Sequence, residues 1–235
     1  MNIIVLISAN AEWRATQPLF PNAPLEHSPF GEYFRASLDI DTDLRVTFFH
    51  GGWGKISAAA TAQYVIDHFQ PDLLVNLGTC GGFEGRIEAG TILLVEKTIV
   101  YDILEQMGDP QGAIADYSTH IDLAWLPKPF PAPVQRGLLV SGDRDIVVED
   151  IPILVSRFGA SAADWESGAI AWVAHKNRIR CLILRGVTDL VGSGGGEAYG
   201  NFDLFQQRTN EVMRQLVELL RDWLENMNRL GLPAA

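Results

Sequence analysis

Three acidic residues stand where a folded chain could use them for chemistry. Glu12 soon follows an apolar run at residues 3–7, Asp189 ends a second apolar run, and Glu166 directly precedes a helical run of small residues. A carboxylate in such a place can accept hydrogen bonds from sugar hydroxyls, with Trp165 beside Glu166 as an apolar platform. Each also has an ordinary structural explanation, because Glu166 suits a helix cap, Asp189 a turn, and Glu12 the solvated start of a helix.

A glycine-rich segment at residues 76–83 is a fourth candidate. Thr79, Gly81 and Gly82 follow an apolar run, so backbone amides and one hydroxyl could approach a ligand closely. The segment has neither the glycine spacing of a dinucleotide site nor the Lys and Ser/Thr of a P-loop. A plain tight turn explains it equally well.

The elements that must position these residues follow from apolar runs that alternate with helix-length segments. Strands are expected at residues 3–7, 45–50, 73–77, 91–95, 137–140 and 181–185, a turn at 41–43, and helices at 57–69, 167–176 and 203–230. Continuous apolar strands separated by helices indicate an α/β protein whose sheet is covered on both faces. Ligands of such sheets bind at the carboxyl ends of strands, where the candidate residues lie.

Residues 101–133 depart from this alternation. They are rich in Pro and Gly, which predicts loops that could cap a site. The strands on either side are expected to share one sheet, so residues 1–235 are predicted to form a single domain.

Composition narrows the class of protein. The 29 acidic residues outnumber the 18 Lys and Arg, giving a net charge of -11, which disfavours nucleic acid as a partner. Cys80 and Cys181 lie in apolar contexts, as expected of reduced thiols in a cytosol-like compartment. The first residues lack a signal-peptide pattern, and no apolar run reaches membrane-spanning length, so a soluble cytoplasmic protein without a membrane partner is expected. The five histidines are scattered, and neither a metal nor a cofactor is expected.

Taken in order, these motifs resemble the nucleoside phosphorylase/nucleosidase superfamily. The likeness extends over nearly the whole chain and is greatest to the 5'-methylthioadenosine/S-adenosylhomocysteine nucleosidases, especially the plant-type enzymes. It rests on Glu12, the glycine turn at 51–55 before an Ala-rich helix, the segment 76–83, Ser-Gly-Asp at 141–143, and the segments 164–171 and 185–189. The resemblance implies a central mixed β-sheet flanked by α-helices, a purine nucleoside as substrate, and a homodimer.

The resemblance also implies a role for each acidic residue. Asp189 matches the general acid that protonates the base at N7, and Thr188 the hydroxyl residue beside it. Glu166 matches the carboxylate that binds the ribose hydroxyls, and Trp165 an apolar residue packed against the sugar. Glu12 matches the residue that positions and deprotonates the attacking water. The chemistry agrees, because glycoside cleavage needs anionic stabilisation of the sugar and protonation of the leaving group.

The remaining positions are assigned to binding. A turn that lines the sugar and base in the family is matched by Thr79, Gly81 and Gly82. The family's 5'-alkylthio pocket lies near the positions of Trp53 and Phe202. Near the base, the Ser-Gly-Asp motif is followed by Ile146. Bacterial members carry an aromatic residue here that stacks on adenine, whereas this chain has Arg144 and Asp145. The identity of the base therefore stays open.

Three alternatives remain at this point. Arg14 and Arg86 leave room for a phosphate-dependent purine nucleoside phosphorylase. A hydrolase of another purine nucleoside, such as a 6-oxopurine or futalosine-like substrate, fits the same motifs. The third alternative, a non-catalytic nucleoside-binding protein, is disfavoured because all three carboxylates are present.

Overall fold

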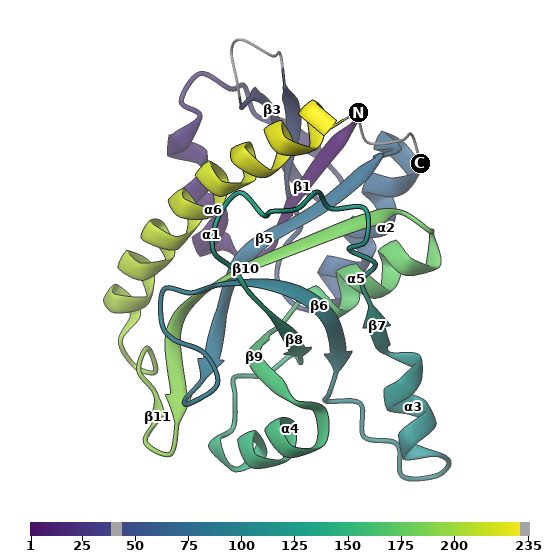
Figure 1. Cartoon of the computed structure of the whole chain (residues 1–235), viewed down its shortest axis with the longest axis vertical. Coiled ribbons are helices and arrows are strands. Elements are labelled where there is room, and N and C mark those ends of the chain that lie inside the picture. The colour runs from purple at the N-terminus through teal and green to yellow at the C-terminus, as the bar shows by residue number, and fades with distance from the viewer. Residues whose placement is uncertain (39–43, 231–235) are drawn as a thin grey trace.

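Two long parallel strands, β5 (Leu73–Phe83) and β10 (Arg180–Gly192), form the centre of the sheet in the computed structural model of the chain (Figure 1). The structure describes residues 1–38 and 44–230. The other strands are β1 (Ile3–Ile7), β2 (Glu26–Ser28), β3 (Gly31–Ser37), β4 (Arg45–His50), β6 (Ile92–Val100), β7 (Ser118–His120), β8 (Gln135–Ser141), β9 (Ala160–Asp164) and β11 (Gly195–Gly196). The helices are α1 (Asn10–Thr16), α2 (Lys55–Phe69), α3 (Pro110–Asp116), α4 (Ile151–Phe158), α5 (Ser167–Lys176) and α6 (Phe202–Leu230), with 3-10 turns η1 (Gln17–Leu19) and η2 (Val148–Asp150).

The pairing of these strands closes part of the sheet on itself. β10 pairs with β5 on one side and with β6 on the other, and β6, β8, β9 and β5 follow one another as neighbours. On the far side of β5 the sheet continues through β1 and β4 to β3 and β2. β1, β4, β5 and β10 run parallel, whereas β10 and β6 are antiparallel, so the predicted mixed sheet is confirmed. The parallel strands end at the same edge, where ligands bind in such folds.

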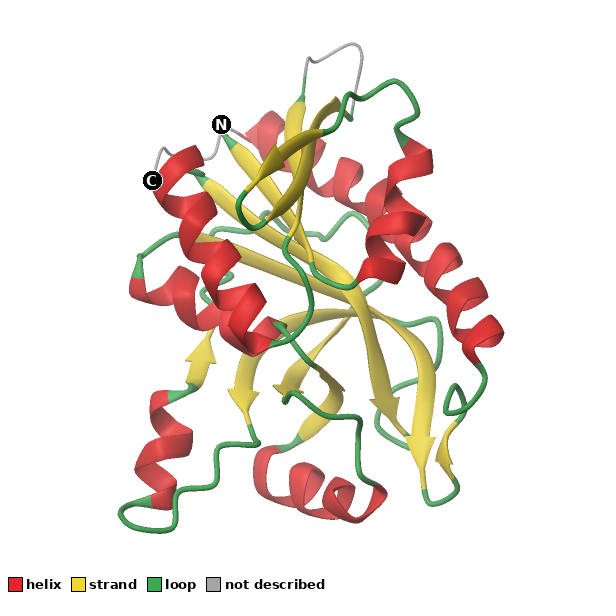
Figure 2. Cartoon of the chain, turned by 180° about the vertical axis from the view of Figure 1, so that it is seen from behind, coloured by secondary structure: helices red, strands yellow, loops and turns green. Residues whose placement is uncertain are grey.

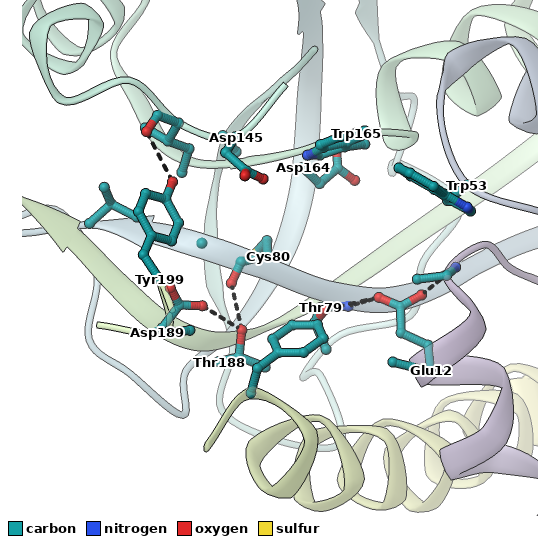
Figure 3. Close-up of a pocket in the computed structure, with 18 of the residues that line it drawn as sticks. Glu12, Trp53, Thr79, Cys80, Asp145, Asp164, Trp165, Thr188, Asp189 and Tyr199 are labelled. Carbon is teal, nitrogen blue, oxygen red and sulfur yellow. Dashed lines mark hydrogen bonds between the residues drawn. The ribbon is translucent and has the colours of Figure 1, made fainter. Parts of the chain in front are cut away.

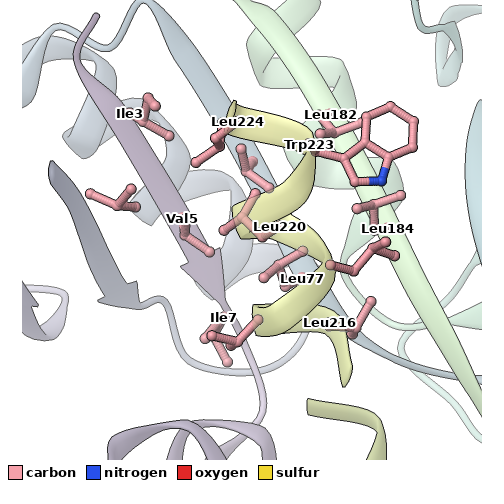
Figure 4. Packing of buried hydrophobic residues seen from close by; sticks show 14 of the residues in the cluster. Ile3, Val5, Ile7, Leu77, Leu182, Leu184, Leu216, Leu220, Trp223 and Leu224 are labelled. Carbon is pink, nitrogen blue, oxygen red and sulfur yellow. The ribbon is translucent and has the colours of Figure 1, made fainter. Parts of the chain in front are cut away.

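Helices cover both faces of the sheet, as the two opposite views show (Figure 1, Figure 2). Along β1 the side chains alternate: Ile3, Val5 and Ile7 pack in one apolar cluster, while Ile4 and Leu6 belong to another. Leu216, Leu220, Trp223 and Leu224 of α6 complete the first cluster (Figure 4), and side chains of α2 and α5 complete the second. Strands buried on both faces explain the continuous apolar runs in the sequence.

The predicted strands and helices are found; β1 and β4 have the expected bounds, and the other predicted strands are longer than expected. β5 and β10 continue through Thr79 and Thr188 into the candidate site, since those polar side chains are held by hydrogen bonds within the fold. Among the elements that were not predicted are β2, β3, α4 and β9. β9 consists of small residues and an Asp, which carry little strand preference of their own. The turn expected at residues 41–43 lies outside the described residues.

Residues 101–133 do not cap the site, so that prediction is wrong. They contain α3 and β7, and β7 extends the sheet beside β6. Leu126 is buried in the α6 cluster, and Phe130 stacks on Trp223 with ring centroids 5.0 Å apart. The apolar side chains at the end of this segment, from Leu123 to Ala132, are thus used in packing in the cluster that contains α6. Within the described part of the chain, none of the helices combines the length and apolar content that a bilayer crossing requires.

Candidate active site

A cavity of about 900 Å³ opens at the carboxyl ends of the central strands (Figure 3). Its walls come from α1 and the turn before it, the ends of β5, β9 and β10, the turn before α2, the segment after β8, and the segment that leads into α6. Glu12, Glu166 and Asp189 all line it, and each is almost fully buried, with exposed fractions of 2%, 6% and 6%. Three buried carboxylates around one cavity are costly unless polar partners hold them, and the structure supplies such partners.

Glu12 is held from three directions. Its Oε1 accepts hydrogen bonds from the backbone amide of Thr79 at 2.6 Å and from the Thr79 hydroxyl at 2.9 Å. Its Oε2 accepts from the amide of Ala9 at 3.2 Å, a bond that also caps the start of α1. The side chain is therefore fixed at the border between β5 and α1 and directed into the cavity.

A fully buried arginine joins this carboxylate to the rest of the site. Arg185 on β10 lies 3.6 Å from Glu12 through Nη1 and pairs with Asp164 through Nη2 at 2.9 Å. Its Nε donates to the Ser167 hydroxyl at 2.9 Å, and Nη2 also donates to the side chain of Asn76 at 2.8 Å. A guanidinium is always charged and presents donors in a fixed fork, so Arg185 can hold several groups in one geometry.

Glu166 stands at the start of α5, facing the turn before α2. Its Oε1 accepts the amide of Gly54 at 2.9 Å, and Gly54 has φ +86°, a conformation that glycine adopts readily. Burial and the nearby Asp164 carboxylate raise the pKa of Glu166 to about 8, although Arg185 and the Gly54 amide oppose that rise. The carboxyl group is thus poised between its neutral and ionised forms near neutral pH.

This shift predicts a pH-dependent stability. Unfolded, Glu166 titrates near pH 4.5, and folded near pH 8. The stabilisation that Glu166 adds to the free energy of unfolding is therefore fully present below pH 4.5. It is lost as the pH rises to about 8, at up to about 1.4 kcal/mol per pH unit. The free energy of unfolding, from urea denaturation at pH 5 to 8, should fall less steeply in Glu166→Gln than in the wild-type chain. Glu218→Gln, at an exposed position on α6, should leave the slope unchanged. Equal slopes in Glu166→Gln and wild type would refute the prediction.

Asp189 and Thr188 share the opposite end of the cavity. The pairing of β10 with β5 shifts register between Val187 and Asp189, which is a β-bulge. Neighbouring residues of a regular strand face opposite sides, and the bulge instead lets both side chains line the cavity. The Thr188 hydroxyl donates to Asp189 Oδ1 at 2.8 Å. Burial raises the pKa of Asp189, against the hydrogen bonds from Thr188 and the Ala198 amide, which lower it.

Aromatic side chains form the mouth of the cavity. Trp53 and Trp165 lie against each other with ring centroids 5.2 Å apart, and Trp53 is 57% exposed. Phe202, at the start of α6, is 62% exposed and lines the same opening. A ligand that enters between them meets apolar surface before it reaches the carboxylates.

The structure brings together all but one of the predicted site residues. Thr79, Gly81, Trp165, Thr188, Ile146, Trp53 and Phe202 line the cavity with the three carboxylates. Gly82 does not line it. A side chain on Gly81 would meet Ile146 and Val191, whereas one on Gly82 would meet Ile87, Val187 and Leu190, because successive strand residues face opposite sides.

Several residues of the site were missed in the sequence. Arg185 is a charged residue inside an apolar strand, which is itself a sign of a paired buried charge. Asp164 and Tyr199 gave no such signal, since their roles depend on segments far away in the chain. Of the two arginines considered for phosphate, Arg14 lines the cavity, and Arg86 is not among the described residues that do.

Comparisons with known proteins agree with this geometry. The family model of the phosphorylase superfamily matches residues 3–224. A 5'-methylthioadenosine/S-adenosylhomocysteine nucleosidase of Buchnera aphidicola from Schizaphis graminum is 32% identical over 198 residues, covering 80% of this chain and 83% of its own. The enzyme of the same name from Thermotoga maritima is 26% identical, with 74% and 79% covered.

Solved structures show the same fold. The apo 5'-methylthioadenosine nucleosidase of Arabidopsis thaliana superposes with a TM-score of 0.77 at 22% identity, covering 97% of this chain and 96% of its own. The nucleosidase of S. pneumoniae, solved with a transition-state inhibitor, gives 0.75 at 20% identity, with 97% and 100% covered. The resemblance read from the ordered motifs is confirmed.

Proposed function

Because the chain belongs to the phosphorylase superfamily and, within it, to the 5'-methylthioadenosine/S-adenosylhomocysteine nucleosidases, we propose that it hydrolyses the N-glycosidic bond of 5'-methylthioadenosine. The products are adenine and 5-methylthioribose. One observation carries the proposal. A single cavity is lined by three carboxyl groups from distant parts of the chain, those of Glu12, Glu166 and Asp189, and each has different neighbouring groups. S-Adenosylhomocysteine, which differs in its 5'-substituent, is the second substrate to test.

Asp189 acts as the general acid in this proposal. As the bond between C1' and N9 breaks, its electron pair passes to the base, and Asp189 delivers a proton to N7. A carboxyl group can do this near neutral pH only if its pKa is raised, and burial raises that of Asp189. The Thr188 hydroxyl at 2.8 Å keeps the acid in place.

Glu12 and Glu166 act on the water and the sugar. The oxygen of water bonds to C1', and Glu12 accepts the proton that the water loses. Thr79, Ala9 and Arg185 fix the Glu12 carboxylate for that step. Glu166 accepts hydrogen bonds from the ribose hydroxyls, and in its ionised form its negative charge stabilises the oxocarbenium-like transition state.

The aromatic mouth suits an apolar 5'-substituent. Trp53, Trp165 and Phe202 offer ring surface at the opening of the cavity, whose described lining residues include two cations, Arg14 and Arg144. A methylthio group would pack against these rings with little desolvation cost.

The deciding experiment measures release of free base from 5'-methylthioadenosine with and without inorganic phosphate. We expect equal rates, with 5-methylthioribose as the sugar product and incorporation of ¹⁸O from labelled water at C1'. Strict phosphate dependence and formation of a sugar phosphate would instead identify a phosphorylase. A panel that includes S-adenosylhomocysteine, adenosine and inosine identifies the base and the 5'-group, and failure to cleave every member would refute the proposal.

We further propose a cytoplasmic homodimer. The buried free thiols of Cys80 and Cys181 suit a reducing compartment. Ile56, at the start of α2, is 84% exposed, and Trp53, three residues earlier in the chain, is exposed as well and lines the cavity, so this part of the chain offers apolar surface. Light scattering on the purified chain tests the dimer, and a monomer mass at micromolar concentration would refute it.

A further inference from the structure

The segment between β11 and α6 carries an aromatic side chain into the end of the cavity that holds Asp189. Figure 3 shows Tyr199 beside Asp189, away from Trp53. The Tyr199 hydroxyl donates to the backbone carbonyl of Ile146 at 2.9 Å. Tyr199 thus reaches across the cavity from the wall that precedes α6 to the segment that follows β8.

Three anchors fix the backbone around Tyr199. The amide of Ala198 donates to the Asp189 carboxylate. The Glu197 carboxylate accepts from Arg208 at 2.8 Å, and Arg208 also donates to the carbonyl of Thr188 at 2.9 Å. The segment is therefore tied to the same two residues that form the acid end of the site, so the position of Tyr199 and that of Asp189 depend on each other.

Gly196 makes room for the tyrosine ring. A side-chain carbon placed on Gly196 would lie 2.6 Å from two ring atoms of Tyr199, closer than any real contact allows. A turn hydrogen bond from the Tyr199 amide to the Gly196 carbonyl, at 3.0 Å, holds the ring against this glycine. The Tyr199 ring can thus occupy this position only because Gly196 has no side chain.

The surroundings of Tyr199 suit a planar, partly polar ligand. Ile146 and Val191 supply apolar side chains, and both lie so close to Gly81 that a side chain on Gly81 would meet them. Burial and the carboxylates of Asp145 and Asp189 raise the pKa of Tyr199 to about 12, so its hydroxyl remains a donor. Aromatic rings bind heterocyclic bases by stacking on the face of the base, whichever polar groups lie on the edge of that base.

We propose that Tyr199 is the base-contacting residue of this site, with its ring packing against the purine while Asp189 reaches the base edge. This inference rests on the proposed function, which places a purine at that end of the cavity. The hydroxyl bond to Ile146 sets the angle of the ring, and the ring supplies most of the contact.

Binding of free adenine, measured by calorimetry, tests the inference separately from turnover. Tyr199→Ala should weaken adenine binding about 5- to 100-fold, whereas Tyr199→Phe, which keeps the ring, should stay within about threefold of wild type. Gly196→Ala, which leaves Tyr199 in the chain but displaces its ring, should weaken binding in the same direction as Tyr199→Ala. Affinity for 5-methylthioribose should not change in any of the three variants.

Tyr117→Ala is the matched control. Tyr117 is 37% exposed, against 45% for Tyr199, and it stacks on Trp172 away from the cavity. Unchanged adenine binding in Tyr199→Ala would overturn the inference, and so would equal losses in Tyr199→Ala and Tyr199→Phe, which would assign the effect to the hydroxyl. Absence of adenine binding and of nucleoside cleavage in the wild-type chain would instead refute the proposed function itself.

Discussion

Replacing Asp189 by Asn is expected to lower kcat for 5'-methylthioadenosine by about 10²- to 10⁴-fold, the range that general acid catalysis contributes. The amide has nearly the shape of the carboxyl group, and its oxygen can still accept from Thr188 and Ala198. It cannot deliver a proton to the departing base. Substrate binding should therefore survive while turnover is lost, and KM should stay within a few-fold of wild type.

The pH profile gives an independent check of the same residue. The acid must be protonated, so wild-type activity should decline as the pH rises through the raised pKa of Asp189. The residual activity of Asp189→Asn should lack that decline. Asp116→Asn is a suitable control, because Asp116 is exposed and lies 3.9 Å from Lys176 on the surface. Turnover of Asp189→Asn within about threefold of wild type would exclude Asp189 as the acid.

Replacing Arg185 by Met is expected to destabilise the fold by about 3–5 kcal/mol, because it leaves buried carboxylates without their cation. Glu12 and Asp164 both face Arg185, and the side chain of Arg185 is fully buried.

Urea denaturation measures this loss, with the slope of the transition as a check that unfolding stays cooperative. Arg221→Met is the matched control, since Arg221 pairs with Glu225 on the exposed face of α6, where such a pair contributes about 0.5 kcal/mol or less. Arg185→Lys keeps the charge but cannot contact Asp164, Asn76 and Ser167 together, so an intermediate loss is expected. Equal stability of Arg185→Met and Arg221→Met would show that the buried network is not needed for folding.

Local patterns predicted the α/β class and the main strands and helices. β1 and the central parts of β5 and β10 are unbroken apolar runs, and strands buried on both faces need such runs. α6 keeps its apolar residues on one face over many turns, which identified it as the helix that closes one side of the sheet. Elements made of small residues, such as β9, carry no such signal, because their strand conformation comes from pairing with β5 and β8.

The sequence by itself also determined which acidic residues to consider. Glu12, Glu166 and Asp189 each sit at the boundary of an element, and the ordered motifs around them identify the family. Their convergence on one cavity, by contrast, is a property of the sheet, whose parallel strands bring residues far apart in the chain to a single edge.

The tertiary structure alone decided how these residues work. The bulge in β10 turns Asp189 to the same side as Thr188, the buried Arg185 connects Glu12 to Asp164, and strand alternation admits Gly81 to the cavity while it excludes Gly82. Each of these features depends on a partner strand or on burial. Neither register nor desolvation is encoded in the residue types of one segment, because both arise only when distant segments pack together.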